Sequence, residues 1–176
     1  MNSFWVFFAI GSAFLAWFSW AVSLRARRYH GIARFFAFES ILTLFLLNVR
    51  FWFDEPFSVV HILAWISLAA SLFLAVHGAY LLMTLGRPDG QLENTTRLVV
   101  RGAYRFIRHP LYASVAFLGL GIFLKRVTVL TSVFAGVVLV AVYLTAKIEE
   151  QEMLAKFGTE YAAYRAGTKM FIPFIF

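Results

Sequence analysis

The stretch of this chain with the greatest capacity for chemistry is 101–112, which reads Arg-Gly-Ala-Tyr-Arg-Phe-Ile-Arg-His-Pro-Leu-Tyr. It places three arginines, a histidine and two tyrosines in a chain that is 61% hydrophobic. Pro110 disfavours helix at His109 and is itself accommodated in a helix's first turn. We therefore predict a helix start that sets Arg108 and His109 beside free backbone N–H groups, which is an anion site. The alternative is a basic loop that only sets membrane topology, and spacing alone does not separate the two.

A pair of glutamates follows the last apolar segment. At helical spacing, Glu150 heads an apolar stripe made of Leu154, Phe157, Tyr161 and Tyr164. Glu149 heads a charged stripe, typical of a solvated face, made of Glu152, Lys156 and Glu160. We expect Glu150 to point into the protein, where a buried carboxylate requires a partner. In a purely structural role, this partner would be Arg108 or Arg105. In a functional role, it would be a cationic ligand.

The segments that must position these residues are long and apolar. Residues 3–24 carry no charge and would extend about 33 Å as a helix, enough to cross a bilayer core. The pattern predicts an all-α, polytopic membrane protein with about five transmembrane helices and a C-terminal cytoplasmic helix. We place the spans near 3–24, 35–53, 57–85, 109–124 and 127–146.

Positive charge gathers on one side of these spans. The loop 25–34 carries four arginines and no acid, and the loop 86–108 and the C-terminal tail are also basic. The turns at 54–56 and 125–126 fall on the other side. Because cytoplasmic loops are enriched in Lys and Arg, we predict an external N-terminus and a cytoplasmic C-terminus in the cell membrane.

Polar residues within the predicted spans are functional candidates by default. Glu39 lies five residues after Arg34 and most simply pairs with it or with another loop arginine. His77 lies at a depth that Glu39 could reach, so a Glu39–His77 pair is a second possibility.

Composition excludes several classes of site. Cysteine is absent, so the chain has no disulfide, thiolate nucleophile or Cys-ligated metal. The four histidines are not paired at helical spacing, and we expect no metal. The net charge of +7 gathers at the ends of apolar spans, which fits the lipid bilayer as partner better than nucleic acid.

Two motif blocks resemble a known family. The first is Gly102-x-Tyr104-x-x-x-Arg108-His109-Pro110-x-Tyr112, and the second is Glu149-Glu150 followed by Leu154, Phe157-Gly158, Tyr161, Tyr164 and Pro173. Both resemble the integral-membrane methyltransferases related to isoprenylcysteine carboxyl methyltransferase and phospholipid N-methyltransferases. The resemblance covers the chain from about Leu98 onward. One departure is Ser114, where the family often has glycine.

The length and the apolar pattern predict one membrane domain, 1–176, with three spans in 1–85, and the resemblance implies that 86–176 is the cofactor-binding and catalytic half. It implies that S-adenosylmethionine is bound by the Arg-His-Pro segment and the glutamate pair: Tyr104, Arg108, His109, Leu111, Tyr112, Glu149 and Glu150. If the lipophilic acceptor is methylated on a carboxylate, we expect Arg165 to hold that carboxylate. An amine acceptor needs a base, and His109 or Glu150 could serve.

Two other readings stay open at this point. One is a sterol-type membrane reductase that binds NADPH. The other is a membrane module without enzymatic activity. Cofactor binding separates the two enzymes, and only the module would tolerate alanine at positions 108, 109 and 150.

Overall fold

A computed structural model describes residues 2–26, 29–90 and 95–175, and within these ranges the regular structure is helical. It contains five α-helices: α1 (Asn2–Val22), α2 (His30–Asn48), α3 (Val59–Thr84), α4 (Pro110–Phe123) and α5 (Val129–Gly167). Short 3-10 turns follow α1, follow α2 and precede α4: η1 (Leu24–Ala26), η2 (Val49–Phe51) and η3 (Gly102–Arg105). The predicted all-α, polytopic membrane fold is confirmed.

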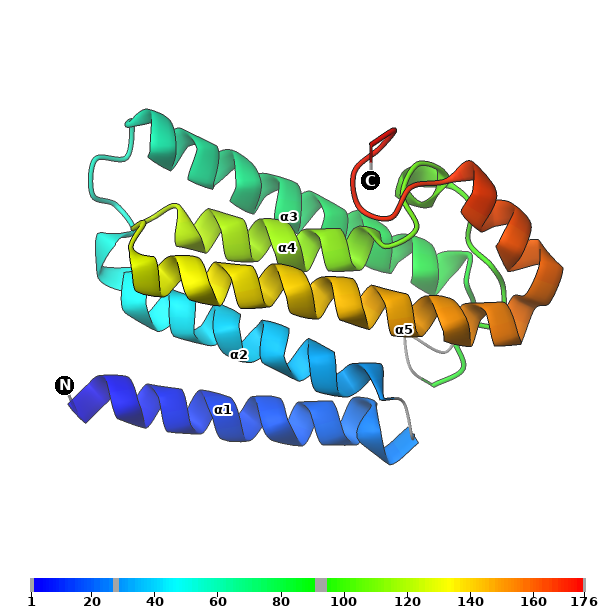
Figure 1. Cartoon of the computed structure of the whole chain (residues 1–176), viewed down its shortest axis with the longest axis horizontal. Coiled ribbons are helices and arrows are strands. Elements are labelled where there is room, and N and C mark those ends of the chain that lie inside the picture. The colour runs from blue at the N-terminus through cyan, green and yellow to red at the C-terminus, as the bar shows by residue number, and fades with distance from the viewer. Residues whose placement is uncertain (1, 27–28, 91–94, 176) are drawn as a thin grey trace.

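Successive α-helices run in opposite directions across the bundle (Figure 1). α4 packs along α3, α5 packs along α2, and α1 packs on α2 at the edge. One end, which we call the basic end, gathers the α1–α2 connection, the segment between α3 and α4, and the C-terminal part of α5. The turns between α2 and α3 and between α4 and α5 lie at the other end. Arg27, Arg28 and Glu93, which contribute to the predicted charge bias, lie outside the described residues.

Among the described residues, four helical segments are long and apolar enough to cross a membrane: Ser3–Val22, His30–Phe51, Val59–Thr84 and Val129–Gly167. Their outward faces carry large apolar side chains, such as Trp17 on α1 and Phe73 on α3, which are about three-fifths exposed in the isolated chain. The buried core is small and lies where α2, α4 and α5 meet, around Leu44, Ile122 and Val138. Apolar surface of this extent requires a lipid environment.

α4 is the short helix of the bundle. Its 14 residues extend only about 21 Å, less than a bilayer core of about 30 Å. It is held between α3 and α5 and contributes a row of small or compact buried residues. Ser114 belongs to this row, and its carbonyl accepts a 2.8 Å hydrogen bond from the Ser71 hydroxyl of α3. The serine therefore permits close packing of the two helices.

The partners predicted for Glu39 are not the ones observed. The Ser12 hydroxyl of α1 donates to Glu39, and no bond joins Glu39 to Arg34 or His77 among the described residues. The His77 ring instead stacks on Phe73, with 5.4 Å between ring centroids. The reason is the packing order: α2 contacts α1, while α3, which carries His77, contacts α4.

Candidate active site

An ion pair joins the two motif blocks at the basic end. Arg108 Nε lies 2.8 Å from Glu150 Oε1, and the Glu150 side chain is only 1% exposed. Arg108 Nη1 also donates to the carbonyl of Arg165, at 3.2 Å, and to that of Thr168. The predicted burial of Glu150 and its pairing with Arg108 are confirmed. Arg108 therefore ties the entrance of α4 to both the middle and the end of α5.

The C-terminal tail folds back along the Arg-His-Pro segment. The Arg108 N–H donates to the Lys169 carbonyl at 2.8 Å, and the His109 N–H donates to the Met170 carbonyl at 3.2 Å. Pro110, at the first position of α4 as predicted, has no N–H. Only the next two N–H groups of the first turn, those of Leu111 and Tyr112, lack a partner within the helix. The predicted anion site therefore has fewer free backbone N–H donors than the sequence indicated.

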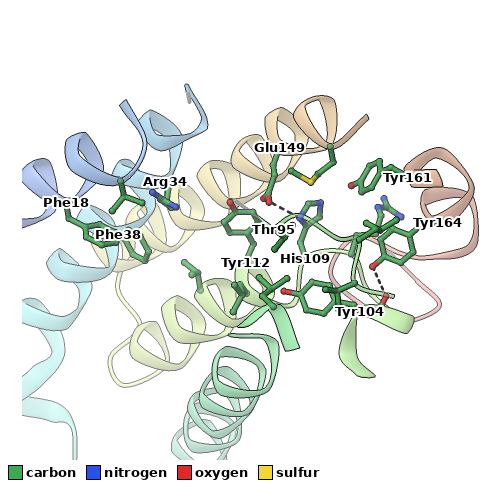
Figure 2. A pocket seen from close by; sticks show the side chains of 18 residues that line it. Phe18, Arg34, Phe38, Thr95, Tyr104, His109, Tyr112, Glu149, Tyr161 and Tyr164 are labelled. Carbon is green, nitrogen blue, oxygen red and sulfur yellow. Dashed lines mark hydrogen bonds and ion pairs between the residues drawn. The ribbon is translucent and has the colours of Figure 1, made fainter. Parts of the chain in front are cut away.

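His109 lies between the two glutamates, at ion-pair distance from each but without a hydrogen bond to either (Figure 2). Its Nδ1 is 3.8 Å from Glu149 Oε2 and its Nε2 is 3.7 Å from Glu150 Oε1, both too long for hydrogen bonds. His109 Nε2 and Glu150 Oε2 are buried without a hydrogen-bond partner, although Arg165 Nε approaches Glu150 Oε2 to 3.5 Å. Buried polar atoms are rarely left unpaired, so these two atoms have hydrogen-bonding capacity for a further polar group.

A cavity of about 420 Å³ opens beside this centre, within the size range of small-molecule sites. Figure 2 shows a cluster of three tyrosines at one end, Tyr104, Tyr161 and Tyr164. His109, Glu149 and Tyr112 occupy the middle. At the other end lie Phe18, Arg34 and Phe38, contributed by α1 and α2. The cavity therefore has an aromatic end, an acidic middle and an apolar end that carries one cation.

A glycine bends α5 around the aromatic end. Gly158 has φ 54° and ψ −125°, a backbone conformation that residues with a side chain rarely adopt. The bend turns the last part of α5 back toward η3 (Figure 1). There the Tyr164 hydroxyl donates a 2.6 Å hydrogen bond to the Tyr104 carbonyl. The predicted role of Gly158, to end or bend this helix, is thus a bend.

Tyr104 is the buried residue of η3, within the segment that precedes α4. Burial, and after it the nearby Glu149 and Tyr164, raises the pKa of the Tyr104 hydroxyl well above its usual range. The hydroxyl therefore stays neutral at physiological pH.

Gly102, at the start of the same motif, has φ 58°, and an added Cβ there would lie 2.7 Å from His77 Nε2. The positive φ and the closeness of His77 explain why the motif begins with glycine.

The structure brings most of the predicted site residues to the cavity. Its lining includes Tyr104, Arg108, His109, Leu111, Tyr112 and Glu149. Glu150 and Arg165 are not in the lining and instead contact each other behind it. The role predicted for Arg165, holding an acceptor carboxylate, stays a prediction.

The predicted solvated face of α5 needs correction. The Glu149 side chain is 21% exposed and lines the cavity, and Glu152 Oε1 lies 3.0 Å from His30 Nδ1 of α2. The first half of the charged stripe is therefore covered, because α2 packs along α5 at this level. Lys156 and Glu160, further along, are exposed as predicted.

Sequence reasoning missed the contribution of the first two helices. Phe18 and Val22 of α1, with Arg34 and Phe38 of α2, form one end of the cavity. The sequence predicts only a topology charge or an ion-pair partner at Arg34. The signal that could have identified it is that Arg34 is the single Lys or Arg of a mostly apolar helix.

The fold and the cavity define a multi-pass helical membrane protein with a candidate ligand site at one end of its bundle. The chain matches the phospholipid methyltransferase family over residues 59–160, more than half of its length, and belongs to that family. It is therefore a member of a membrane methyltransferase family, as the two motif blocks predicted. No curated protein matches the chain significantly. The family match runs from α3 into α5 and leaves α1 and α2 outside it.

Proposed function

We propose that this protein transfers a methyl group from S-adenosylmethionine to a lipophilic acceptor, at a carboxylate oxygen or a headgroup nitrogen. The observation that carries the proposal is the cavity in which both motif blocks meet, with the Glu149 carboxylate and a tyrosine cluster in its wall. Family membership supplies the reaction class. The cofactor and the acceptor are the parts that require experiment.

The side chains present fit the chemical groups of S-adenosylmethionine. Glu149 and the faces of the tyrosine cluster suit a sulfonium and an ammonium group, through charge and cation–π attraction. The N–H groups of Leu111 and Tyr112 suit a carboxylate at a helix N-terminus. His109 Nε2, buried without a partner, is the remaining polar contact. When bound, this cofactor supplies an electrophilic methyl group, whose bond to sulfur breaks as an acceptor lone pair bonds to carbon and S-adenosylhomocysteine is left.

The protein's own contribution is positioning and exclusion of water. A carboxylate acceptor is already a nucleophile and needs no base, whereas an amine acceptor must also release a proton. His109 is placed to take that proton, because Glu150 is held in its ion pair with Arg108. Fixing the two reactants in a dry cavity supplies most of the acceleration in such a displacement.

We further propose that the site faces the cytoplasm and that the acceptor enters sideways from the bilayer. The basic end of the bundle carries the cavity, and basic segments favour the cytoplasmic side. The polar cofactor is available there in water. The apolar outer surfaces of α1 and α2 reach the same cavity from the lipid.

Calorimetric titration of the detergent-solubilised protein with S-adenosylhomocysteine and with NADPH tests the proposal. We expect S-adenosylhomocysteine to bind and to stabilise the fold by about 2.7 kcal/mol at a hundred-fold excess over its Kd. Binding of NADPH alone would instead establish the reductase. No binding of either ligand to protein shown to be folded would refute both.

A further inference from the structure

We propose that the end of the bundle opposite the basic end holds a phospholipid of net negative charge, with its phosphate on Arg50 and Arg126 and an acyl chain in a groove between α2 and α5. This lipid is a bound component of the membrane protein and not the methyl acceptor. Its site shares no lining residue with the cavity, so the inference is independent of the proposed reaction.

Two arginines share one aromatic ring at this end. The central guanidinium carbon of Arg126, in the α4–α5 turn, lies 3.9 Å from the centroid of the Phe51 ring, and that of Arg50 lies 4.8 Å from the same centroid. Phe51 closes η2, so its ring joins the end of the second span to the turn before α5. Both arginines are exposed. Cation–π attraction therefore gathers two like charges at one place and leaves their hydrogen-bond donors available to a ligand.

No acid in the described ranges neutralises this pair. Asp54 and Glu55, the nearest acids in the sequence, are exposed and form no ion pair with either arginine. A third cation, Lys125, is only 3% exposed, and its Nζ lies 3.3 Å from the centroid of the Trp65 ring without a hydrogen-bond partner. Like charges held together without a counter-charge attract an anion, and the planar donor array of a guanidinium suits a phosphate.

An apolar groove of about 440 Å³ lies between α2 and α5. It is lined along α5 from Val133 to Leu144 and on α2 by Ala33 and Phe36. The stretch from Val133 to Leu144 extends about 16 Å along the helix axis, roughly half of a bilayer core of about 30 Å. Val133 lies near the start of α5, and α5 starts shortly after Arg126. The groove therefore has the polarity and the length of an acyl chain in one leaflet, and it begins near the arginine pair.

A phospholipid satisfies both features, whereas each alternative satisfies one. A free anion would leave the groove unfilled, and a helix of a second copy would leave the arginines without a counter-charge. A zwitterionic headgroup brings an ammonium group, which the uncompensated cations repel. Basic sites between membrane helices bind anionic headgroups by this kind of complementarity. The pair and the groove together therefore favour a phospholipid of net negative charge, such as phosphatidylglycerol.

Lipid titration of the delipidated protein in a neutral detergent tests the proposal. The probes are phosphatidylglycerol, phosphatidylcholine with the same acyl chains, and glycerol 3-phosphate, which has a phosphate but no acyl chain. Native mass spectrometry measures the lipid retained, and thermal unfolding at low salt measures the shift in Tm. We expect phosphatidylglycerol to bind about 10-fold more tightly than phosphatidylcholine and to raise Tm, because only its net charge is negative. Glycerol 3-phosphate should do neither.

Removal of the two charges tests the phosphate contacts. We expect Arg50→Gln combined with Arg126→Gln to weaken phosphatidylglycerol binding about 10-fold, to the level of phosphatidylcholine. Arg50→Lys combined with Arg126→Lys should recover part of the loss, because the charge returns without the planar fork. The matched control is Arg25→Gln combined with Arg97→Gln, which removes the same charge from two exposed arginines at the basic end. This control should keep the preference of the wild type.

The Val140→Trp substitution tests the groove. Val140 lines the groove and is 60% exposed, so an indole ring there would take the space of an acyl chain. We expect the affinity for both phospholipids to fall about 10-fold while the preference for negative charge remains. Val76→Trp is the matched control, because Val76 is 61% exposed on α3 and lines neither the groove nor the cavity. Circular dichroism and gel filtration verify that each variant is folded.

Several results would overturn the inference. Absence of saturable phosphatidylglycerol binding, or equal affinity for the two phospholipids in the wild type, would remove the anionic lipid. Equal losses in the charge variant and its basic-end control would show an effect of net charge alone. An equal Tm shift with glycerol 3-phosphate would leave an anion site without a lipid. Unchanged lipid affinity in the Val140→Trp variant would exclude the groove, and a changed oligomeric state in that variant would assign it to a second copy.

Discussion

Two adjacent glutamates perform different tasks in this site. Successive positions on an α-helix lie about 100° apart, so their side chains meet different surroundings. Glu150 is buried in an ion pair with Arg108 and lies behind the cavity. Glu149 faces the cavity and is partly exposed to it. We therefore propose that Glu149 is the acid that meets a cationic ligand and that Glu150 maintains the architecture around it.

The Glu149→Gln substitution tests the ligand role. Glutamine has nearly the same shape but removes the charge, so we expect affinity for S-adenosylhomocysteine to fall about 10- to 100-fold, the range of a hydrogen bond to a charged group. The Tm without ligand should hardly move. Calorimetry and thermal unfolding give both values, with Glu160→Gln on the exposed part of α5 as control. Unchanged affinity in the Glu149 variant would remove this residue from the ligand site.

The Glu150→Gln substitution tests the structural role. It leaves the buried Arg108 without its counter-charge, which typically costs about 3–5 kcal/mol when one member of a buried pair is removed. Arg108 keeps its bonds to the carbonyls of Arg165 and Thr168, so we expect the lower end of that range. The readout is the loss of Tm in ligand-free protein. If binding were lost while Tm was unchanged, Glu150 would be a ligand contact after all.

At the scale of the element, α5 combines a membrane span with one wall of the site. A straight helix of 39 residues would extend about 58 Å and carry its last turns away from the bundle. The bend at Gly158 returns Tyr161 and Tyr164 to the cavity, where the bond from Tyr164 to the Tyr104 carbonyl secures them. The aromatic end of the cavity thus depends on one backbone conformation.

The Gly158→Ala substitution tests this dependence. An added Cβ meets nothing within 4 Å, so any effect comes from the backbone conformation, whose strain with a side chain costs about 1–3 kcal/mol. We expect a lower Tm and weaker S-adenosylhomocysteine binding. Gly136→Ala on the same helix is a matched control, because it also has open space but ordinary helical geometry. Equal effects of the two substitutions would show that the bend does not matter.

At the scale of the whole molecule, the alternating directions of the five α-helices bring distant segments to one end. The α1–α2 connection, the segment before α4 and the bent end of α5 are far apart in sequence and adjacent at the basic end (Figure 1). The odd number of helices in the described chain also sets its N-terminal and C-terminal segments at opposite ends of the bundle. Orientation in the membrane then decides which compartment supplies the cofactor.

Reporter fusions test that orientation. A reporter after Phe176 should give a cytoplasmic signal and a tag before Met1 an external one, because basic segments are retained in the cytoplasm. The measurement is reporter activity and tag accessibility in intact cells. Both ends on one side would contradict a full crossing by each helix, and α4, with only 14 residues, is the helix that would then stop short.

The sequence by itself determined the approximate positions of the membrane spans, the start of α4 and the pairing of Arg108 with Glu150. Apolar length defined the spans, Pro110 marked the start of α4, and the isolated acid in the apolar stripe predicted the buried Glu150 and its bond to Arg108. These features follow from local chemistry: the missing N–H of proline, and the cost of burying a carboxylate without a partner.

Only the tertiary structure decided which neighbour each helix face meets. Lipid and protein interior are both apolar, so in a membrane helix the sequence does not distinguish the face turned to lipid from the face turned to a neighbouring helix. The packing of α2 against α5 therefore set Glu149 in the cavity and covered Glu152. The same packing brought Arg34 into the site, and the position of Arg165 beside Glu150 left it outside the lining. The contacts between α2 and α5 join segments more than a hundred residues apart, and no local pattern encodes them.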